Sequence, residues 1–318
     1  MVKIVFMGTP DFAVPVLRSL SEKGYNVVLV VTQPDRPKGR KQTLTPPPIK
    51  VEGERLHIPI FQPEKIKHEE EWKQVAVVKP DLIVTAAFGQ ILPQELLDVP
   101  RYGCVNVHAS LLPKYRGGAP IHQSIIDGEE QTGVTIMYMV KQLDAGAILT
   151  QRSIPILEED TTGTMHDKLS QIGADLLMET LPLIQEEKLN PQEQEEAKVT
   201  FAPTIKKEQE VIDWQQSAKQ IFNQIRGLNP WPVAFTTVED RRLKIWEARV
   251  KAGKTDKQPG SVIGLTENEI LVACGEKSIL ALLKIQPSGK KPLDVATFLR
   301  GAGGKWTTET MLGAKDNE

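Results

Sequence analysis

Short apolar runs and amphipathic segments alternate over the first half of the chain. The apolar runs are rich in β-branched residues and too short for helices; they lie at residues 2–7, 27–32, 81–86, 104–108, 134–139 and 148–154. Between them, apolar residues recur at helical spacing in segments 11–23, 49–57, 68–78, 93–98 and 119–127. Continuous apolar strands separated by helices predict an α/β domain with a Rossmann-like, mostly parallel sheet that is covered on both faces.

The pattern changes in the second half of the chain. Asp160 to Gly163 form a helix start, and a long helix is predicted from there to about residue 185. A polar, acidic stretch follows, and then come a helix at 217–227 and short strands at 233–238, 243–250, 260–265, 270–273 and 279–285. Closely spaced short strands predict a small OB-like β-barrel. We therefore expect an α/β domain at 1–184, a linker at 185–204 and a C-terminal β-barrel domain at 205–318.

The distribution of charge is more informative than its total. The 318 residues carry 39 Lys and Arg against 41 Asp and Glu, and this net charge of −2 by itself argues against a nucleic-acid partner. However, residues 199–318 hold 18 basic and 14 acidic side chains, and the segment 33–50 has a net charge of +4. Positive charge is therefore gathered in one loop and in the C-terminal domain, which suits binding of a phosphate backbone.

Several function classes are disfavoured by what the sequence lacks. No apolar run is long enough to span a membrane, and the N-terminus does not resemble a signal peptide. There are only two cysteines, Cys104 and Cys274, and the five histidines show no metal-ligand spacing, so we expect a cytoplasmic protein without a metal. Neither a P-loop nor a glycine-rich dinucleotide fingerprint is present, which argues against an NTPase and against NAD as cofactor.

Candidate catalytic side chains lie in and after the strand predicted at 104–108. Asn106 and His108 point to the same side of that strand, because side chains alternate along it. An amide can donate to a carbonyl oxygen, and an imidazole can transfer a proton near neutral pH, although a single His is more often structural. Asp144 is either a turn residue or the partner that orients His108. This trio has no activated Ser or Cys, which favours direct transfer to an external nucleophile.

These residues are parts of longer motifs. The segments Asn106-Val107-His108, Ser110-Leu111-Leu112-Pro113 and Arg116-Gly117-Gly118-Ala119-Pro120, with Asp144, resemble the signature of the 10-formyltetrahydrofolate-dependent formyltransferases. Residues 33–40, 88–93, 132–137 and 229–232 further resemble the members of that family that formylate methionyl-tRNA. The similarity follows nearly the whole chain in order.

The resemblance implies a reaction and a set of site residues. The expected reaction transfers the formyl group of 10-formyltetrahydrofolate directly to the amino group of initiator methionyl-tRNA, for translation initiation. Asn106 would stabilise the oxyanion of a tetrahedral intermediate, His108 would transfer protons, and Asp144 would hold His108 in its tautomer. The folate site would be lined by Ser110, Leu111, Leu112 and Pro113 and walled by Phe88, Gly89, Gln90, Ile91 and Leu92.

The resemblance also implies how tRNA would be held. A connection as long as 33–50 is usually functional or disordered in a compact domain, so a solvated surface loop is the alternative to a tRNA contact. The resemblance favours insertion against the acceptor end, with Arg40 as the most important side chain. The expected tRNA-binding residues are Arg36, Lys38, Arg40, Lys41, Lys206 and Lys207. We expect a monomer without an obligate protein partner.

Two other functions are open on the sequence alone. The acceptor could be an amino-sugar nucleotide, because formyltransferases for such sugars share the trio; the basic loop argues against this. The chain could instead be a non-enzymatic RNA-binding module with a vestigial α/β half, and the complete trio argues against that.

Overall fold

The computed structural model describes residues 2–39 and 41–313, which form two compact units. The first unit comprises Met1–Pro120, Gln131–Pro155 and His166–Pro203. The second comprises Ile121–Glu130, Ile156–Met165 and Thr204–Glu318. The domain boundaries at 184 and 204 that the sequence suggests stay a prediction.

A seven-stranded sheet forms the centre of the first unit, in the order β5-β2-β1-β6-β7-β8-β9. Its strands are β1 (Lys3–Gly8), β2 (Asn26–Val31), β5 (Ile60–Phe61), β6 (Leu82–Ala86), β7 (Cys104–His108), β8 (Gln131–Tyr138) and β9 (Ile148–Pro155). Neighbouring strands from β5 to β7 pair in parallel, whereas β8 is antiparallel to both β7 and β9. The predicted fold class, a mostly parallel α/β sheet, is confirmed.

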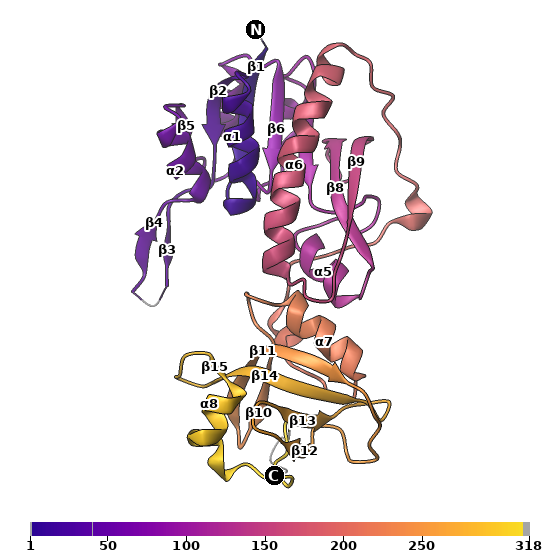
Figure 1. Ribbon diagram of the computed structural model, residues 1–318. Helices are drawn as coiled ribbons and strands as arrows, with labels where there is room; N and C mark the ends of the chain where they lie inside the picture. The colour runs from indigo at the N-terminus through magenta and orange to yellow at the C-terminus, as the bar shows by residue number, and fades with distance from the viewer. Residues whose placement is uncertain (1, 40, 314–318) are drawn as a thin grey trace. The chain divides into compact units, whose positions relative to one another are not determined.

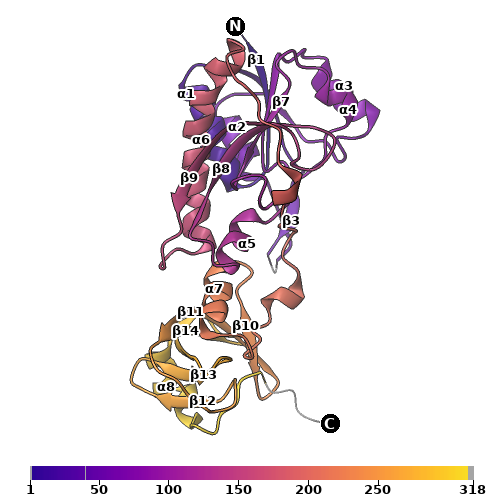
Figure 2. The ribbon, with the colours of Figure 1, turned by 90° about the vertical axis from the view of Figure 1, so that its right-hand side faces the viewer.

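Helices cover both faces of this sheet. α1 (Val14–Glu22) and α6 (Thr162–Gln185) lie on one face (Figure 1), and α3 (Glu69–Ala76) and α4 (Gln94–Leu97) lie on the other (Figure 2). The central strands β1, β6 and β7 are buried over nearly their whole length, which is why they stand out in the sequence as continuous apolar runs. The remaining helical elements of the first unit are η1 (Asp11–Ala13), α2 (Pro48–Arg55) and η2 (Glu196–Lys198), whereas α5 (Pro120–Ile126) falls in the second unit from Ile121 on.

The basic connection after β2 is not an irregular loop. β3 (Arg36–Lys38) and β4 (Thr43–Thr45) pair as an antiparallel hairpin that projects from the unit (Figure 1). Lys50 Nζ lies 2.8 Å from Asp35 Oδ2, so an ion pair closes the base of the hairpin. The hairpin thus presents its basic side chains on a defined backbone.

A buried carboxylate ties α1 to α2 just beyond this hairpin. Glu52 is 6% exposed and accepts hydrogen bonds from Arg55 Nη2 (2.7 Å) and Arg18 Nε (2.8 Å). Hydrogen bonds from Arg55 and then Arg18 lower the pKa of Glu52 from 4.5 to about 2. The carboxylate is therefore ionised at any pH at which the protein works.

An antiparallel sheet forms the core of the second unit, and this part of the fold class is confirmed as well. Its order is β10 (Phe235–Val238), β11 (Arg241–Lys251), β14 (Ile279–Pro287), β13 (Ile270–Ala273) and β12 (Val262–Leu265), with β15 (Leu293–Asp294) paired to β14. α7 (Ala218–Gly227) begins with a capping box between Ser217 and Gln220 and packs Ile221 and Ile225 into this core. The other helical elements are η3 (Lys207–Glu210), α8 (Val295–Arg300) and η4 (Ala302–Lys305).

Candidate active site

The predicted site residues gather at one edge of the parallel sheet. β1 pairs with β2 on one side and with β6 on the other, so the strand order reverses at β1. Ligands of open α/β sheets bind at such a switch point, beyond the carboxyl ends of the strands. Three segments leave the sheet there: residues 9–13 after β1, 87–92 after β6 and 109–113 after β7. Both Asn106 and His108 lie on β7, which ends at His108.

Asn106 is held by a neighbouring strand in a defined orientation. Thr85 on β6 is the register partner of Asn106, and its Oγ1 lies 2.8 Å from Asn106 Oδ1. In this orientation the hydroxyl of Thr85 donates to the amide oxygen of Asn106. The Nδ2 atom remains as a donor for a ligand carbonyl.

His108 is almost fully buried and has an acceptor beside each ring nitrogen. Its Nε2 lies 3.1 Å from the carbonyl oxygen of Tyr115, and its Nδ1 lies 3.7 Å from Asp144 Oδ2. The second distance is an ion-pair distance and is too long for a good hydrogen bond. A proton on either nitrogen therefore has an oxygen next to it that can accept it in a polar contact.

Asp144 lies in a tight turn between β8 and β9 and contacts more than His108. Its Oδ2 accepts a hydrogen bond from the backbone N–H of Gly117 (2.9 Å), and its backbone has a left-handed φ of 49°. Gly146, two residues on, has no room for a side chain, since a Cβ there would lie 1.9 Å from the carbonyl oxygen of Tyr138. The turn thus presses against the end of β8 and holds the carboxylate next to His108.

The segment after β7 is anchored to β8 and β9. Thr135 Oγ1 donates to the carbonyl oxygen of Ser110 (2.7 Å) and accepts from the N–H of Leu112 (3.2 Å). Gln151 Nε2 donates to the carbonyl oxygen of Leu112 (2.8 Å), and Ser110 Oγ donates to the carbonyl oxygen of Lys114 (2.7 Å). The backbone of 110–113 is therefore rigid where the resemblance expects a folate.

A cavity of about 60 Å³ lies beside Asp144. One wall is formed by Gln90, Ile91, Leu92 and Leu97, and the other by residues of β8 and of the turn up to Asp144. Ile91 and Leu143 on its rim are 68% and 54% exposed, so apolar surface is open here for a ligand. Asp144 is the member of the trio that lines this cavity.

Not all predicted folate residues lie in this cavity. Gln90, Ile91 and Leu92 line it, whereas Ser110, Leu111, Leu112 and Pro113 do not. Phe88 is buried in the core under the sheet edge, and its carbonyl oxygen accepts from Thr9 Oγ1 (2.8 Å) and Gln33 Nε2 (3.2 Å). Gly89 follows with φ +84°. The folate assignment of these residues stays a prediction.

The predicted tRNA contacts differ in how free their side chains are. Lys38 and Lys41 are exposed, whereas Arg36 Nη2 lies 2.7 Å from Glu64 Oε2. Arg40 lies outside the described residues. Lys206 and Lys207 are exposed at the start of η3 in the second unit. Their role in tRNA binding stays a prediction.

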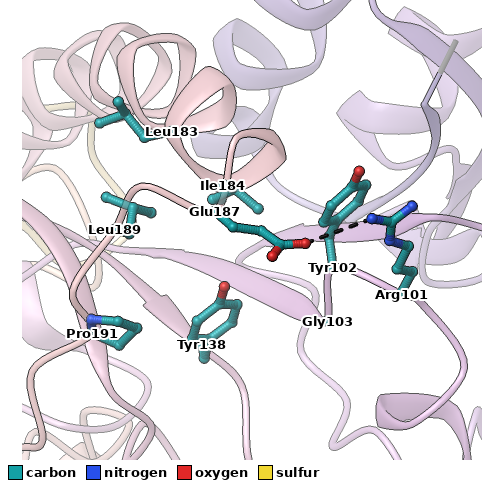
Figure 3. Close-up of a pocket in the computed structure, with 9 residues that line it drawn as sticks. All are labelled: Arg101, Tyr102, Gly103, Tyr138, Leu183, Ile184, Glu187, Leu189 and Pro191. Atoms are coloured by element: carbon teal, nitrogen blue, oxygen red, sulfur yellow. Dashed lines mark ion pairs between the residues drawn. The ribbon is translucent and has the colours of Figure 1, made fainter.

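A larger cavity, of about 370 Å³, lies away from the trio. Figure 3 shows Arg101 and Glu187 facing each other across it, with Nη2 and Oε1 3.6 Å apart, and the rings of Tyr102 and Tyr138 nearby. Gly103 in its lining precedes β7, whereas His108 ends that strand, so this cavity opens at the amino end of β7. Size therefore does not identify the site in this fold.

Other chemistry has little support in the described part of the chain. Burial raises the pKa of the Cys104 thiol and of the Cys274 thiol to about 12, so both stay protonated at neutral pH. Within residues 2–39 and 41–313, no group of three or more His, Cys, Asp or Glu side chains is placed to hold a metal ion. In the same residues no helix is long and apolar enough to cross a membrane.

Sequence reasoning missed the residues that position the trio. Thr85 falls in a strand that the pattern predicts, yet its pairing with Asn106 depends on the register between two strands. The Tyr115 carbonyl and the Gly117 N–H act through the backbone, which the side-chain pattern does not report.

Comparison with known proteins identifies formyl transferase domains in both the N-terminal and the C-terminal part of the chain. The formyl transferase family model matches residues 2–181, and the model of the formyl transferase C-terminal domain matches residues 204–303. Among solved structures, the sugar 3N-formyl transferase WlaRD, in the presence of dTDP and 5-N-formyl-THF, matches with a TM-score of 0.65. It is 20% identical over 92% of this chain and 99% of its own, so the likeness shows a shared fold.

Sequence relatives are much closer. The methionyl-tRNA formyltransferase of Geobacillus sp. (strain WCH70) is 56% identical over 98% of this chain and 98% of its own length. That of Bacillus subtilis (strain 168) is 57% identical over 95% of each chain. With both family models matched in order and identity sustained over the full length, this chain belongs to the methionyl-tRNA formyltransferases of the formyl transferase family.

Proposed function

We infer that this chain transfers a formyl group to the amino group of methionine on initiator methionyl-tRNA. The observation that carries this function is an identity of 55–58% to methionyl-tRNA formyltransferases that extends over both units. This identity to methionyl-tRNA formyltransferases, against 20% to the sugar 3N-formyl transferase WlaRD, supports methionyl-tRNA as the acceptor. We propose 10-formyltetrahydrofolate as the formyl donor and translation initiation in the cytoplasm as the setting.

We propose a direct transfer between the two substrates. The methionine nitrogen attacks the formyl carbon, and the carbonyl electron pair moves onto oxygen to give a tetrahedral intermediate. The Nδ2 atom of Asn106, left free by the hydrogen bond from Thr85, is suited to donate to this oxyanion. The attacking nitrogen then gives a proton to His108, and His108 passes a proton to the folate nitrogen. The oxyanion re-forms the carbonyl group as the bond from the folate nitrogen to carbon breaks, and its electron pair stays on that nitrogen.

His108 has the surroundings that such proton transfer needs. The carbonyl oxygen of Tyr115 and the carboxylate of Asp144 lie on either side of the ring, so each N–H group of the protonated imidazole would have an oxygen beside it. The acceptor amine needs little further activation, because α-amino groups titrate at about 7.7–8.0 and a neutral fraction exists at cellular pH. Most of the rate enhancement would therefore come from positioning and oxyanion stabilisation.

We propose that the folate enters through the cavity between residues 90–92 and the turn at Asp144. The exposed apolar side chains of Ile91 and Leu143 would cover its ring system, and the rigid backbone at 110–113 would border it. The hairpin with Lys38 and Lys41, with Arg40 between them, would contact the acceptor end of the tRNA. We expect a monomer without a metal.

A formylation assay tests the function. Charged initiator tRNA and 10-formyltetrahydrofolate are incubated with the protein, and formylmethionine is measured after hydrolysis of the ester. His108→Ala should lower kcat by at least about 100-fold while binding of both substrates is retained. The assay is repeated with an amino-sugar nucleotide as acceptor. Formylation of the sugar but not of the tRNA would overturn the assignment.

A further inference from the structure

The segment between α6 and the second unit is fastened along the first unit. Gln192 and Ile148 exchange two backbone hydrogen bonds, of 2.8 and 2.9 Å. Further along, the N–H of Arg116 donates to the carbonyl oxygen of Thr200 (2.9 Å), and the N–H of Ala202 donates to that of Arg116 (2.8 Å). We call residues 192–202 the strap. In Figure 1 they belong to the segment that leaves the upper end of α6 and runs down the right-hand side of the first unit. The sequence predicts this segment only as part of a polar, acidic linker.

One side chain of the strap is buried, and it reaches the turn that carries Asp144. Gln194 is 8% exposed, while the residues on both sides of it are exposed. Its Nε2 donates to the backbone carbonyl oxygens of Asp144 and Gly146, each at 2.8 Å. The amide of Gln194 therefore links two carbonyl groups of this turn.

The other end of the same amide contacts a buried arginine. Arg116 Nε donates to Gln194 Oε1 (2.9 Å), and Arg116 Nη2 donates to Glu196 Oε1 (3.0 Å). Arg116 is 1% exposed and directly precedes Gly117, whose N–H donates to the Asp144 carboxylate. Gln194 thus donates to the backbone of Asp144 and accepts from Arg116, and the residue after Arg116, Gly117, donates to the Asp144 carboxylate.

Asp144 is a residue that needs such support. Its left-handed φ of 49° costs free energy for any residue other than glycine. Contacts with the surrounding residues must therefore stabilise this backbone conformation. Its Oδ2 is 3.7 Å from His108 Nδ1, so a small displacement of the turn changes whether the carboxylate reaches the imidazole at all.

We propose that Gln194, together with Arg116, is a positioning residue that holds Asp144 within reach of His108. The inference rests on the proposed function, since it assigns Gln194 a part in the same formyl transfer. It gives one side chain of the strap, Gln194, a part in positioning Asp144, in addition to the covalent connection that the strap makes to the second unit.

The test compares two glutamines of the strap. Gln194→Met keeps the length of the side chain and removes its hydrogen bonds, and Gln192→Met is the matched control, since Gln192 is exposed and its side chain bonds only the carbonyl oxygen of Asn190 among its described contacts. We expect Gln194→Met to lower kcat by about 10–100-fold with KM for both substrates changed by less than about threefold, and Gln192→Met to match the wild type. An unchanged kcat in Gln194→Met would overturn the proposal.

A second set of variants separates positioning from general destabilisation. Gln194→Glu can still accept from Arg116 but cannot donate to the two carbonyl oxygens, so it should stay folded and lose kcat as Gln194→Met does. In an Asp144→Asn background, where the carboxylate is already absent, Gln194→Met should lower kcat by less than about threefold. A loss as large as in the wild-type background would mean a structural role and overturn the proposal. Failure of the wild type to formylate tRNA would instead refute the proposed function.

Discussion

Replacement of Thr85 by valine tests whether the orientation of Asn106 matters for catalysis. Thr85 is 2% exposed, and its hydroxyl donates to Asn106 Oδ1 at 2.8 Å. Valine has nearly the same shape but no hydroxyl. In the proposed mechanism Nδ2 faces the oxyanion, and in the variant that orientation leaves Oδ1 without the hydroxyl that donates to it.

The size of the effect follows from two limits. A half-buried amide oxygen that loses its donor costs about 1–2 kcal/mol, which corresponds to about a 5–30-fold loss in kcat. Loss of the whole oxyanion donor, as in Asn106→Ala, costs about 100–1,000-fold. Thr85→Val should therefore lie between the wild type and Asn106→Ala, and Thr85→Ser, which keeps the hydroxyl, should remain close to the wild type.

Steady-state formylation of charged initiator tRNA at saturating donor measures these differences. The double variant Thr85→Val/Asn106→Ala adds a sharper criterion, because Thr85 is argued to act only through Asn106. We expect the double variant to equal Asn106→Ala alone. A wild-type kcat in Thr85→Val, or a double variant clearly slower than Asn106→Ala, would refute the reasoning.

Three further predictions address the turn, the hairpin and the buried carboxylate. Gly146→Ala should displace the Asp144 turn and lower kcat at least about tenfold, because its Cβ would meet the carbonyl oxygen of Tyr138 at 1.9 Å; a fully active variant would contradict the close packing. Lys38→Ala/Lys41→Ala should raise KM for tRNA and reduce the salt dependence of tRNA binding by about one to two counterions, with KM for the folate unchanged. Glu52→Gln should lower the free energy of unfolding by about 2 kcal/mol at pH 7, a value reduced for solvent screening at the half-exposed arginine partners of Glu52. Because the pKa of Glu52 is lowered from 4.5 to about 2, the difference from the wild type should be fully present above pH 4.5 and should shrink as the pH falls toward 2. Thermal unfolding at pH 7 and at pH 3 measures this change. A difference that does not change with pH would assign the loss to packing.

Much of the fold was predictable because its signals are local. The central strands of the first sheet are buried on both faces, so they stand out as apolar runs, and α6 and α7 carry clear start signals. The β3-β4 hairpin was missed, since Arg36, Pro37 and Lys38 have low strand propensity and their pairing does not bury a face. The two-residue strands β5 and β15 are too short to leave a periodic pattern.

The site was predictable to the extent that its residues share one strand. Asn106 and His108 are two positions apart on β7, so alternation alone brings them together. Asp144 was placed with them by family resemblance, and the structure brings its carboxylate within 3.7 Å of His108. Thr85 and Gln194 contact the trio or its turn across 21 and 50 residues of chain, and no local pattern reports such pairs.

The strap also bears on how proteins of this kind can be recombined. The formyl transferase model ends at residue 181, a natural junction for exchanging C-terminal domains between relatives. A chimera joined there would import a foreign sequence at Gln194 and at the partners of Arg116, and its native trio would depend on whether that sequence fits. A junction after Pro203 would carry the strap along with the chemistry. The N-terminal segment that must be transferred to keep the trio intact is therefore longer than the segment that the formyl transferase model matches.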